Sequence, residues 1–427
     1  MQQIASQNAP SANIVIPHFA FGSLAWLTAT LFIALSPDAF TTHYFNPKLL
    51  AITHLLVLGW ISMIIWGALY QLIPVILDAK LFSEQLAIFS FFTLAAGSIL
   101  LCFSFWNFLL GGVLHLAATL IISAVIGFSF NIFKTAQTSR NKSIERDFIL
   151  TSTLWLLFTV LSGFVFALNL KYAFLKPEHL RLLKIHAHTG LVGWFLQLIM
   201  GVASRLLPMF MVAHSLNKKK LQIAYYCINA GLLLSISSFF LNTIIDIIIT
   251  AIILITGVFY FVSYLKEAYT KRVKKNFDTG MKQSVLSFVS LLLVCIISLL
   301  LLFYTHENHS PRLAIAYGSL IIIGFISSLI LGQTFKTLPF IIWLKVYKKL
   351  IGKIKMPLPK ELYSEKLLTI QLYLFFAGFF FLLLGIILSH HTVITLSGTL
   401  LFISALLYTI NTFKIILHKP HIHEKTN

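Results

Sequence analysis

Four histidines lie within long apolar stretches of the sequence. They are His54, His115, His186 and His188. An imidazole inside a membrane needs a hydrogen-bond partner or a metal ion, because an unsatisfied polar group is costly there. Four such side chains at similar depth favour a metal or haem site over four separate hydrogen bonds to neighbouring carbonyl or hydroxyl groups.

The spacing of these histidines limits how they can bind. On a helix with about 100° per residue, His186 and His188 point about 200° apart and face two neighbouring inter-helix spaces. His54 and His188 occupy equivalent positions of an internal repeat, so they are expected at one height. Two neutral imidazoles at one height suit the axial positions of a haem iron. His54 and His188 are the preferred pair, His115 is the alternative ligand, and copper is the rival metal.

Tyr317 adds a phenol to this set of residues. It stands two positions before Ser319, just as His186 stands two positions before His188 in the repeat. This equivalence predicts a pocket shared with His186, so His186 and Tyr317 form a candidate copper site. His188 is a further candidate metal ligand, on the other side of the helix. The alternative is that Tyr317 belongs to the belt of aromatic residues at the outer membrane interface.

The elements that carry these residues are predicted to be membrane helices. Of the 427 residues, 58% are hydrophobic and 11% are charged, which excludes a water-soluble protein. The apolar blocks are about 20 residues long, enough to cross about 30 Å of hydrocarbon. The predicted fold is therefore an all-α integral membrane protein with twelve transmembrane helices. Their ranges are 14–36, 49–77, 86–105, 107–133, 148–172, 185–213, 222–242, 244–265, 283–304, 313–343, 367–389 and 392–413.

The basic residues predict the orientation of these helices. If the N-terminus is cytoplasmic, the inner connections and the tail hold 24 Lys and Arg and the outer connections hold 6. This bias predicts a multi-pass protein of a bacterial-type inner membrane with both termini in the cytoplasm. The net charge of +19 is then explained by membrane topology rather than by binding to nucleic acid.

An internal repeat organises the twelve helices. The segments 54–74, 188–208 and 319–339 align without gaps, and each ends in a proline. Each also contains a glycine before an aromatic residue and a second glycine seven positions before the proline, which would let helices approach closely in lipid. The repeat predicts one membrane domain, 1–427, made of three pseudo-symmetric four-helix units at about 14–133, 148–265 and 283–413. The paired residues are Gly59 and Trp60, Gly193 and Trp194, and Gly324 and Phe325, and the second glycines are Gly67, Gly201 and Gly332.

This arrangement resembles the catalytic subunit of the haem-copper oxidases and nitric oxide reductases, the family of cytochrome oxidase subunit I. The resemblance implies that His54, in THLLVLGW, is an axial ligand of a b-type haem. The segment HAHTGLVGWF, with His186 and His188, also looks like the His-rich motifs of NnrS-type haem and copper membrane proteins. Tyr317 and Ser319 stand where the family has two histidines on helix 10, and helix 7 lacks the expected pair of copper ligands. The usual catalytic centre is therefore not implied, and enzymatic activity is left open.

Three classes of function remain open from the sequence. The first is a haem-binding membrane protein, with copper as a further metal, in respiratory electron transfer or in nitric oxide or oxygen chemistry. It would have the lipid bilayer and a cytochrome or another respiratory subunit as partners. The second is a twelve-helix secondary transporter, although the only acidic residue well inside a predicted span is Asp246. The third is a non-catalytic partner subunit of a respiratory complex.

Overall fold

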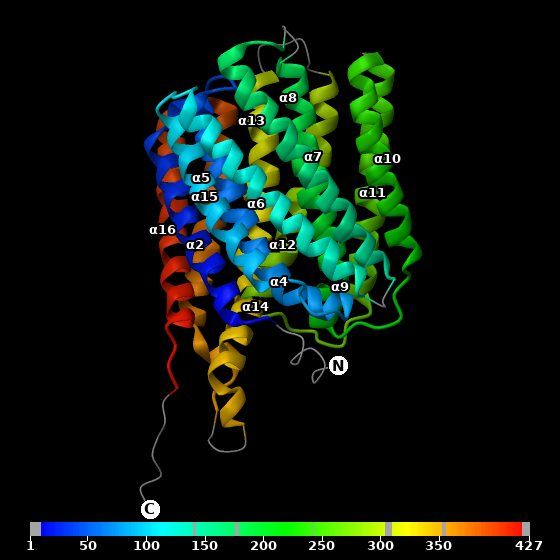
Figure 1. The fold of residues 1–427 in the computed structure, drawn as a ribbon, viewed down its shortest axis with the longest axis vertical. Helices are drawn as coiled ribbons and strands as arrows, with labels where there is room; N and C mark the ends of the chain where they lie inside the picture. Colours follow the sequence, from blue (N-terminus) through cyan, green and yellow to red (C-terminus); the bar gives the residue numbers. More distant parts are fainter. Residues whose placement is uncertain are drawn as a thin grey trace, which may run out of the picture.

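The computed structural model describes residues 10–139, 142–175, 179–241, 243–303, 310–351 and 356–420. Twelve long helical segments run along its long axis (Figure 1). In the part of the chain that is described, eleven of them are long and apolar enough to cross a membrane, so the protein is an all-α multi-pass membrane protein as predicted. Nine are uninterrupted: α2 (Ala12–Leu35), α5 (Glu84–Trp106), α6 (Gly112–Gln137), α7 (Ile144–Tyr172), α10 (Lys219–Leu241), α11 (Ile244–Thr270), α12 (Thr279–Phe303), α15 (Glu365–Leu388) and α16 (His391–Ile416).

The second, sixth and tenth helices each contain a π-helical segment. In this conformation the chain is wound more widely than in an α-helix, and such segments are often found at functional sites. The three π segments cover the same eight positions of the sequence repeat, so the repeat extends to the backbone conformation. The second helix consists of α3 (Pro47–His54), η2 (Leu55–Ser62) and α4 (Met63–Leu77), the sixth of α8 (His179–His188), η3 (Thr189–Leu196) and α9 (Gln197–Met211), and the tenth of α13 (Ser310–Ser319), η4 (Leu320–Ser327) and α14 (Ser328–Tyr347).

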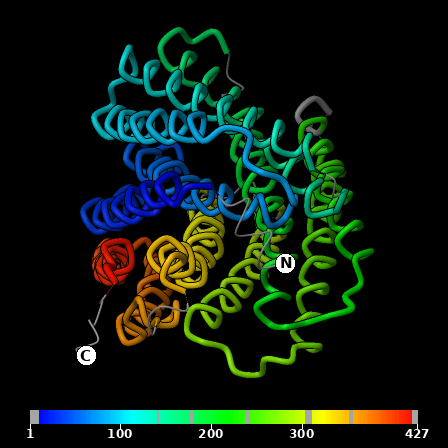
Figure 2. The backbone as a smooth tube through the Cα atoms, turned by 60° about the horizontal axis from the view of Figure 1, so that its bottom comes forward, coloured from blue at the N-terminus to red at the C-terminus, as the bar shows by residue number. Residues whose placement is uncertain are grey.

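These three π-containing helices form the interior of the bundle. The most apolar windows of the second, sixth and tenth helices are 67%, 78% and 78% buried, whereas no other candidate span exceeds 50%. The remaining helices surround them in chain order, and the ring closes where α16 lies beside α2 (Figure 2). Short 3₁₀ turns occur in the connections, namely η1 (Pro37–Phe40), η5 (Lys348–Leu350) and η6 (Pro359–Leu362).

The second glycine of each motif marks a close crossing with the helix that precedes it in the chain. A Cβ atom at Gly67 would lie 2.6 Å from the Cβ of His18 on α2, and one at Gly201 would lie 2.6 Å from the Cβ of Phe148 on α7. A Cβ at Gly332 would collide with the backbone oxygen of Gly280 on α12. Larger residues would push the helices apart at all three crossings, which explains why the repeat keeps glycine there.

The prolines of the repeat differ in their effect on the helices. Helices α4 and α9 end three residues after Pro74 and Pro208, and the residues that follow, Asp78 and Val212, have φ values of 49° and 55°. These two positions are equivalent in the repeat. Helix α14 instead continues beyond Pro339 to Tyr347. The helix therefore ends close to the proline in two of the three copies and continues past it in the third.

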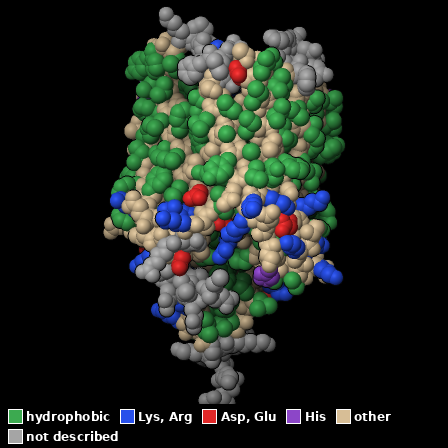
Figure 3. Space-filling view, turned by 90° about the vertical axis from the view of Figure 1, so that its right-hand side faces the viewer, with side chains coloured by type: hydrophobic (Ala, Val, Ile, Leu, Met, Phe, Trp, Pro, Cys, Tyr) green, Lys and Arg blue, Asp and Glu red, His purple; other side chains and the backbone are tan. Residues whose placement is uncertain are grey.

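Basic side chains gather at one end of the molecule. Figure 3 shows Lys and Arg at the lower end, below a broad hydrophobic band. Helix α2 begins and α16 ends at this same end (Figure 1). Acidic residues here pair with lysines: Glu145 with Lys218 at 3.0 Å, Glu267 with Lys220 at 2.8 Å, and Asp278 with Lys336. The two ends of the described chain therefore lie on the basic side of the membrane band.

Candidate functional site

His54 ends α3 immediately before the first π segment. Its Nδ1 lies 2.8 Å from the backbone oxygen of Leu50, and its ring lies 5.2 Å from the ring of Phe105, measured between centroids. A carbonyl oxygen can only accept, so Nδ1 must carry the proton. The lone pair of Nε2 is therefore available to a metal, and histidine ligands are commonly oriented by such a bond from the other ring nitrogen.

His188 repeats this geometry at the equivalent position before the second π segment. Its Nδ1 lies 2.7 Å from the backbone oxygen of Lys184, again four residues earlier in the helix. The proton is thus on Nδ1 and the Nε2 lone pair is available. The equivalence of His54 and His188 that the repeat predicts therefore extends to their side-chain hydrogen bonds.

His186 is oriented by the neighbouring helix α7 rather than by its own helix. Its Nδ1 lies 3.0 Å from both the backbone oxygen of Thr159 and the Oγ of Ser162, and Ser162 donates its own proton to Thr159. The imidazole also packs on Gly163, where a Cβ would lie 2.9 Å from Cε1. Because both neighbours accept from Nδ1, its Nε2 lone pair is available as well.

The three imidazoles on the second and sixth helices do not all face one space. His186 packs against α7, where its Nδ1 bonds the backbone oxygen of Thr159. His188 faces the opposite side, where its ring centroid lies 6.0 Å from that of Tyr317 on α13. This separation agrees with the angle of about 200° expected between the two residues.

Tyr317 and His115 each pack against one other ring. The ring of Tyr317 lies beside that of His188. His115 on α6 stacks on Tyr172 at the end of α7, with ring centroids 5.7 Å apart, and its Nε2 is buried with no hydrogen-bond partner among the described residues. The sequence could not place these rings, since the repeat gives the height of a residue but not its neighbour on another helix.

A metal site with several protein ligands does not emerge from these groups. Among the described residues, no cluster of three or more His, Cys, Asp and Glu side chains could hold a metal ion. A haem needs only two axial imidazoles, and the imidazoles with available Nε2 lone pairs on the second and sixth helices fit that requirement. It fits a copper ion less well, because His186 and His188 face different spaces and Tyr317 accompanies only the second.

Some residues around the site were not singled out in the sequence. Thr159, Ser162 and Gly163 hold His186 in place, and Tyr172 covers His115. All four lie on α7, which carries none of the candidate histidines. Three of them belong to a short cluster of polar residues and glycine in the sequence, T-V-L-S-G at 159–163.

Comparison with known proteins supports the fold but does not identify a family. No family model matches the sequence. A protein of Aquifex aeolicus (strain VF5), described only as uncharacterized, is 27% identical over 331 residues, which are 77% of this chain and 79% of that protein. A solved chain of a haem-copper terminal oxidase dimer has a TM-score of 0.65 and 11% identity, and the match covers 96% of this chain and 85% of the other. The protein therefore has the fold of that chain of a haem-copper terminal oxidase.

Proposed function

We propose that the protein is a haem-binding membrane protein of respiratory electron transfer, or of nitric oxide or oxygen chemistry. The observation that carries this proposal is the set of oriented imidazoles next to the π segments, each with its proton on Nδ1 and its Nε2 lone pair available. The oxidase fold of the whole chain supports it. A bound b-type haem would supply one-electron redox chemistry.

The proposed haem lies in the outer half between the second and sixth helices, with His54 as one axial ligand. The repeat favours His188 as the second ligand, because it is equivalent to His54. His186, two residues earlier on the same helix, is the other candidate for the second ligand, because its Nε2 lone pair is also available. In either pair the backbone or hydroxyl acceptors at Nδ1 would fix the orientation of the rings and make Nε2 a better donor. His115 stays the alternative ligand, because its Nε2 is buried and has no hydrogen-bond partner among the described residues.

The proposed architecture is three pseudo-symmetric four-helix units. Supporting observations are the three π segments at equivalent positions and the crossing of each second glycine with the first helix of its unit. We further propose a bacterial-type inner membrane with both termini in the cytoplasm, since both described ends lie on the basic side. A redox role would require an electron donor such as a cytochrome or another respiratory subunit.

Reduction of a gas at the usual haem and copper centre of the oxidases is not part of the proposal. The positions on α13 that would carry haem ligands in the oxidases hold Tyr317 and Ser319. Copper stays a secondary proposal, at a site near His186, or near His188 and Tyr317.

The test is a visible absorption spectrum of the purified protein, recorded oxidised and reduced, together with elemental analysis. We expect haem bands that shift on reduction and about one iron per chain, the content that one bis-imidazole haem gives. A protein produced with sufficient haem that contains neither iron nor copper would overturn the redox proposal. In that case the transporter or the partner subunit becomes the better interpretation.

A further inference from the structure

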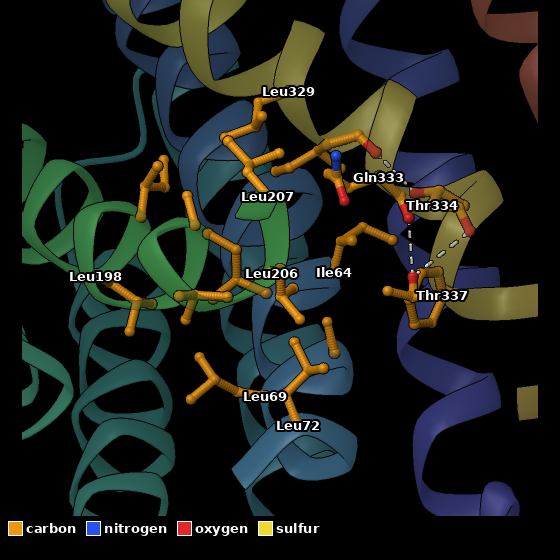
Figure 4. Close-up of a pocket in the computed structure, with 17 residues that line it drawn as sticks. Ile64, Leu69, Leu72, Leu198, Leu206, Leu207, Leu329, Gln333, Thr334 and Thr337 are labelled. Atoms are coloured by element: carbon orange, nitrogen blue, oxygen red, sulfur yellow. Dashed lines mark hydrogen bonds between the residues drawn. The ribbon is translucent and has the colours of Figure 1, made fainter. Parts of the chain in front are cut away.

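A second site lies in the half of the bundle away from the candidate histidines. A cavity of about 110 Å³ lies between α4, α9 and α14 (Figure 4). These helices follow the π segments toward the basic side of the molecule. Most of its wall is aliphatic, with contributions from all three helices, for example Leu69, Leu207 and Leu329. The polar side chains of its lining, Gln333 and two threonines, all come from α14. The cavity is thus an apolar space with one polar wall.

The two threonines of this wall donate their hydroxyl protons to backbone oxygens of α14. The Oγ1 of Thr337 lies 3.0 Å from the backbone oxygen of Gln333, and the Oγ1 of Thr334 lies 2.9 Å from that of Ile330. Thr334 also bonds the phenol of Tyr408 at 3.0 Å. Neither threonine therefore needs a ligand to satisfy it.

Gln333 is different because half of its amide has no partner. Its Nε2 donates to the Oγ of Ser284 at 2.7 Å, and Ser284 donates its own proton to the backbone oxygen of Gly280. Ser284 can therefore only accept from Gln333, which fixes the nitrogen toward Ser284 and leaves Oε1 on the other side. This Oε1 is buried and has no hydrogen-bond partner among the described residues.

We propose that the cavity binds a small apolar molecule that carries one hydrogen-bond donor, such as a phenol. Its aliphatic walls suit the apolar part of a ligand. The unpaired Oε1 of Gln333 can accept one hydrogen bond from an O–H or N–H group of that ligand. An apolar cavity of about 150 Å³ in another protein holds a benzene ring, so the space here is of the size that suits a single ring. The proposal is independent of whether the protein binds haem.

The experiment compares two probes of nearly the same shape, 4-fluorophenol and 4-fluorotoluene, by ¹⁹F NMR with the full chain in lipid nanodiscs. Empty nanodiscs give the background of partition into lipid. We expect saturable binding of both probes, with 4-fluorophenol about tenfold tighter, because one neutral hydrogen bond that satisfies a buried acceptor is worth about that factor.

Three variants separate the role of the acceptor from the role of the space. Gln333→Leu should abolish the preference for 4-fluorophenol and retain binding of 4-fluorotoluene. Ala203→Phe should fill the cavity and abolish binding of both probes, with Ala68→Phe as a second filling variant if the first does not fold. Gln283→Leu is the matched control, since Gln283 is a fully buried glutamine with an unpartnered amide that does not line the cavity.

The results that would overturn the proposal are specific. Binding no stronger than to empty nanodiscs, or binding that persists in a folded filling variant, would exclude the cavity as the site. An unchanged preference in Gln333→Leu, or the same loss of preference in Gln283→Leu, would exclude Gln333 as the acceptor. Circular dichroism and thermal unfolding identify the variants that are folded.

Discussion

Trp60 donates a hydrogen bond of 3.0 Å from its indole Nε1 to the Oγ of Ser327, which lies 267 residues away in the sequence. The bond joins the π segments of the second and tenth helices at the centre of the bundle, where both side chains are fully buried. Ser327 donates its own proton to the backbone oxygen of Ile322, five residues earlier, and is therefore free to accept. Two copies of the repeat are thus linked by a buried polar contact. The sequence pattern alone does not predict this contact.

The first prediction concerns the stability of this contact. Ser327→Ala should lower the free energy of unfolding by about 1 to 3 kcal/mol, because it leaves the buried indole N–H of Trp60 without an acceptor. The matched control is Ser62→Ala, at the equivalent position of the first repeat copy. The hydroxyl of Ser62 is buried and has no partner among the described residues, so its removal should cost less. Denaturation in mixed detergent micelles measures both, and equal losses would contradict the prediction.

The second prediction tests the axial ligands. His54→Ala should remove the reduced-minus-oxidised haem bands while the protein stays in the membrane, since His54 belongs to both candidate pairs. Either His186 or His188 is the second axial ligand. Only the Ala variant of that histidine should also lose the haem bands. His43→Ala is the control, because His43 is exposed and outside the histidine set. A haem spectrum that survives the change at His54 would exclude it as a ligand.

The third prediction concerns Gly163, which packs against the imidazole of His186. A Cβ at Gly163 would lie 2.9 Å from Cε1 of the imidazole, so Gly163→Ala should displace the ring without removing any donor atom. If His186 is the ligand opposite His54, the haem absorption bands and the reduction potential should shift. If His188 is the ligand, they should stay unchanged. Gly318→Ala is the control, since a Cβ there meets nothing within 4 Å.

The sequence was sufficient to predict the elements of this fold but not their contacts. All twelve helices were predicted from blocks of apolar residues, because hydrocarbon imposes their length and composition. The π segments were not predicted, since Leu55–Ser62 is as apolar as an α-helical span and its winding depends on packing at the bundle centre. The partner of Tyr317 could not be predicted either, because the contact with His188 depends on how α8 and α13 are rotated.

The fourth prediction concerns orientation in the membrane. Both described ends lie on the side where Lys and Arg gather, and this side should face the cytoplasm. Alkaline phosphatase is active only on the outer side of the cytoplasmic membrane. When it is fused to the C-terminus it should therefore be inactive. A fusion after Phe45, in the connection at the opposite end, should be active. Activity of the C-terminal fusion would contradict the orientation.

The last prediction concerns Asp278, which precedes α12 on the basic side. Burial by itself raises the pKa of this carboxyl group, but the hydrogen bond and charge of Lys336 outweigh burial and hold the pKa below its ordinary value of 3.8. Lys274 adds a second positive charge at 3.6 Å. Because the pKa is lower in the folded state, the ion pair stabilises the fold at pH values above about 4. This contribution is lost as the pH falls below 3.8 and through the lowered pKa.

Asp278→Asn should therefore lower the free energy of unfolding at pH 7 by about 1 to 2 kcal/mol, a value between those of exposed and buried ion pairs. The difference from the native protein should shrink as the pH falls below 3.8, because the native carboxyl group is then protonated too. Asp38→Asn is the control, since Asp38 and Lys48 are 3.9 Å apart and about half exposed, and such pairs contribute little. Unfolding curves between pH 2.5 and pH 7 measure the effect, with pH values chosen to bracket the ordinary carboxyl pKa. A difference that stays constant across this range would show that Asp278 acts through packing rather than through its charge.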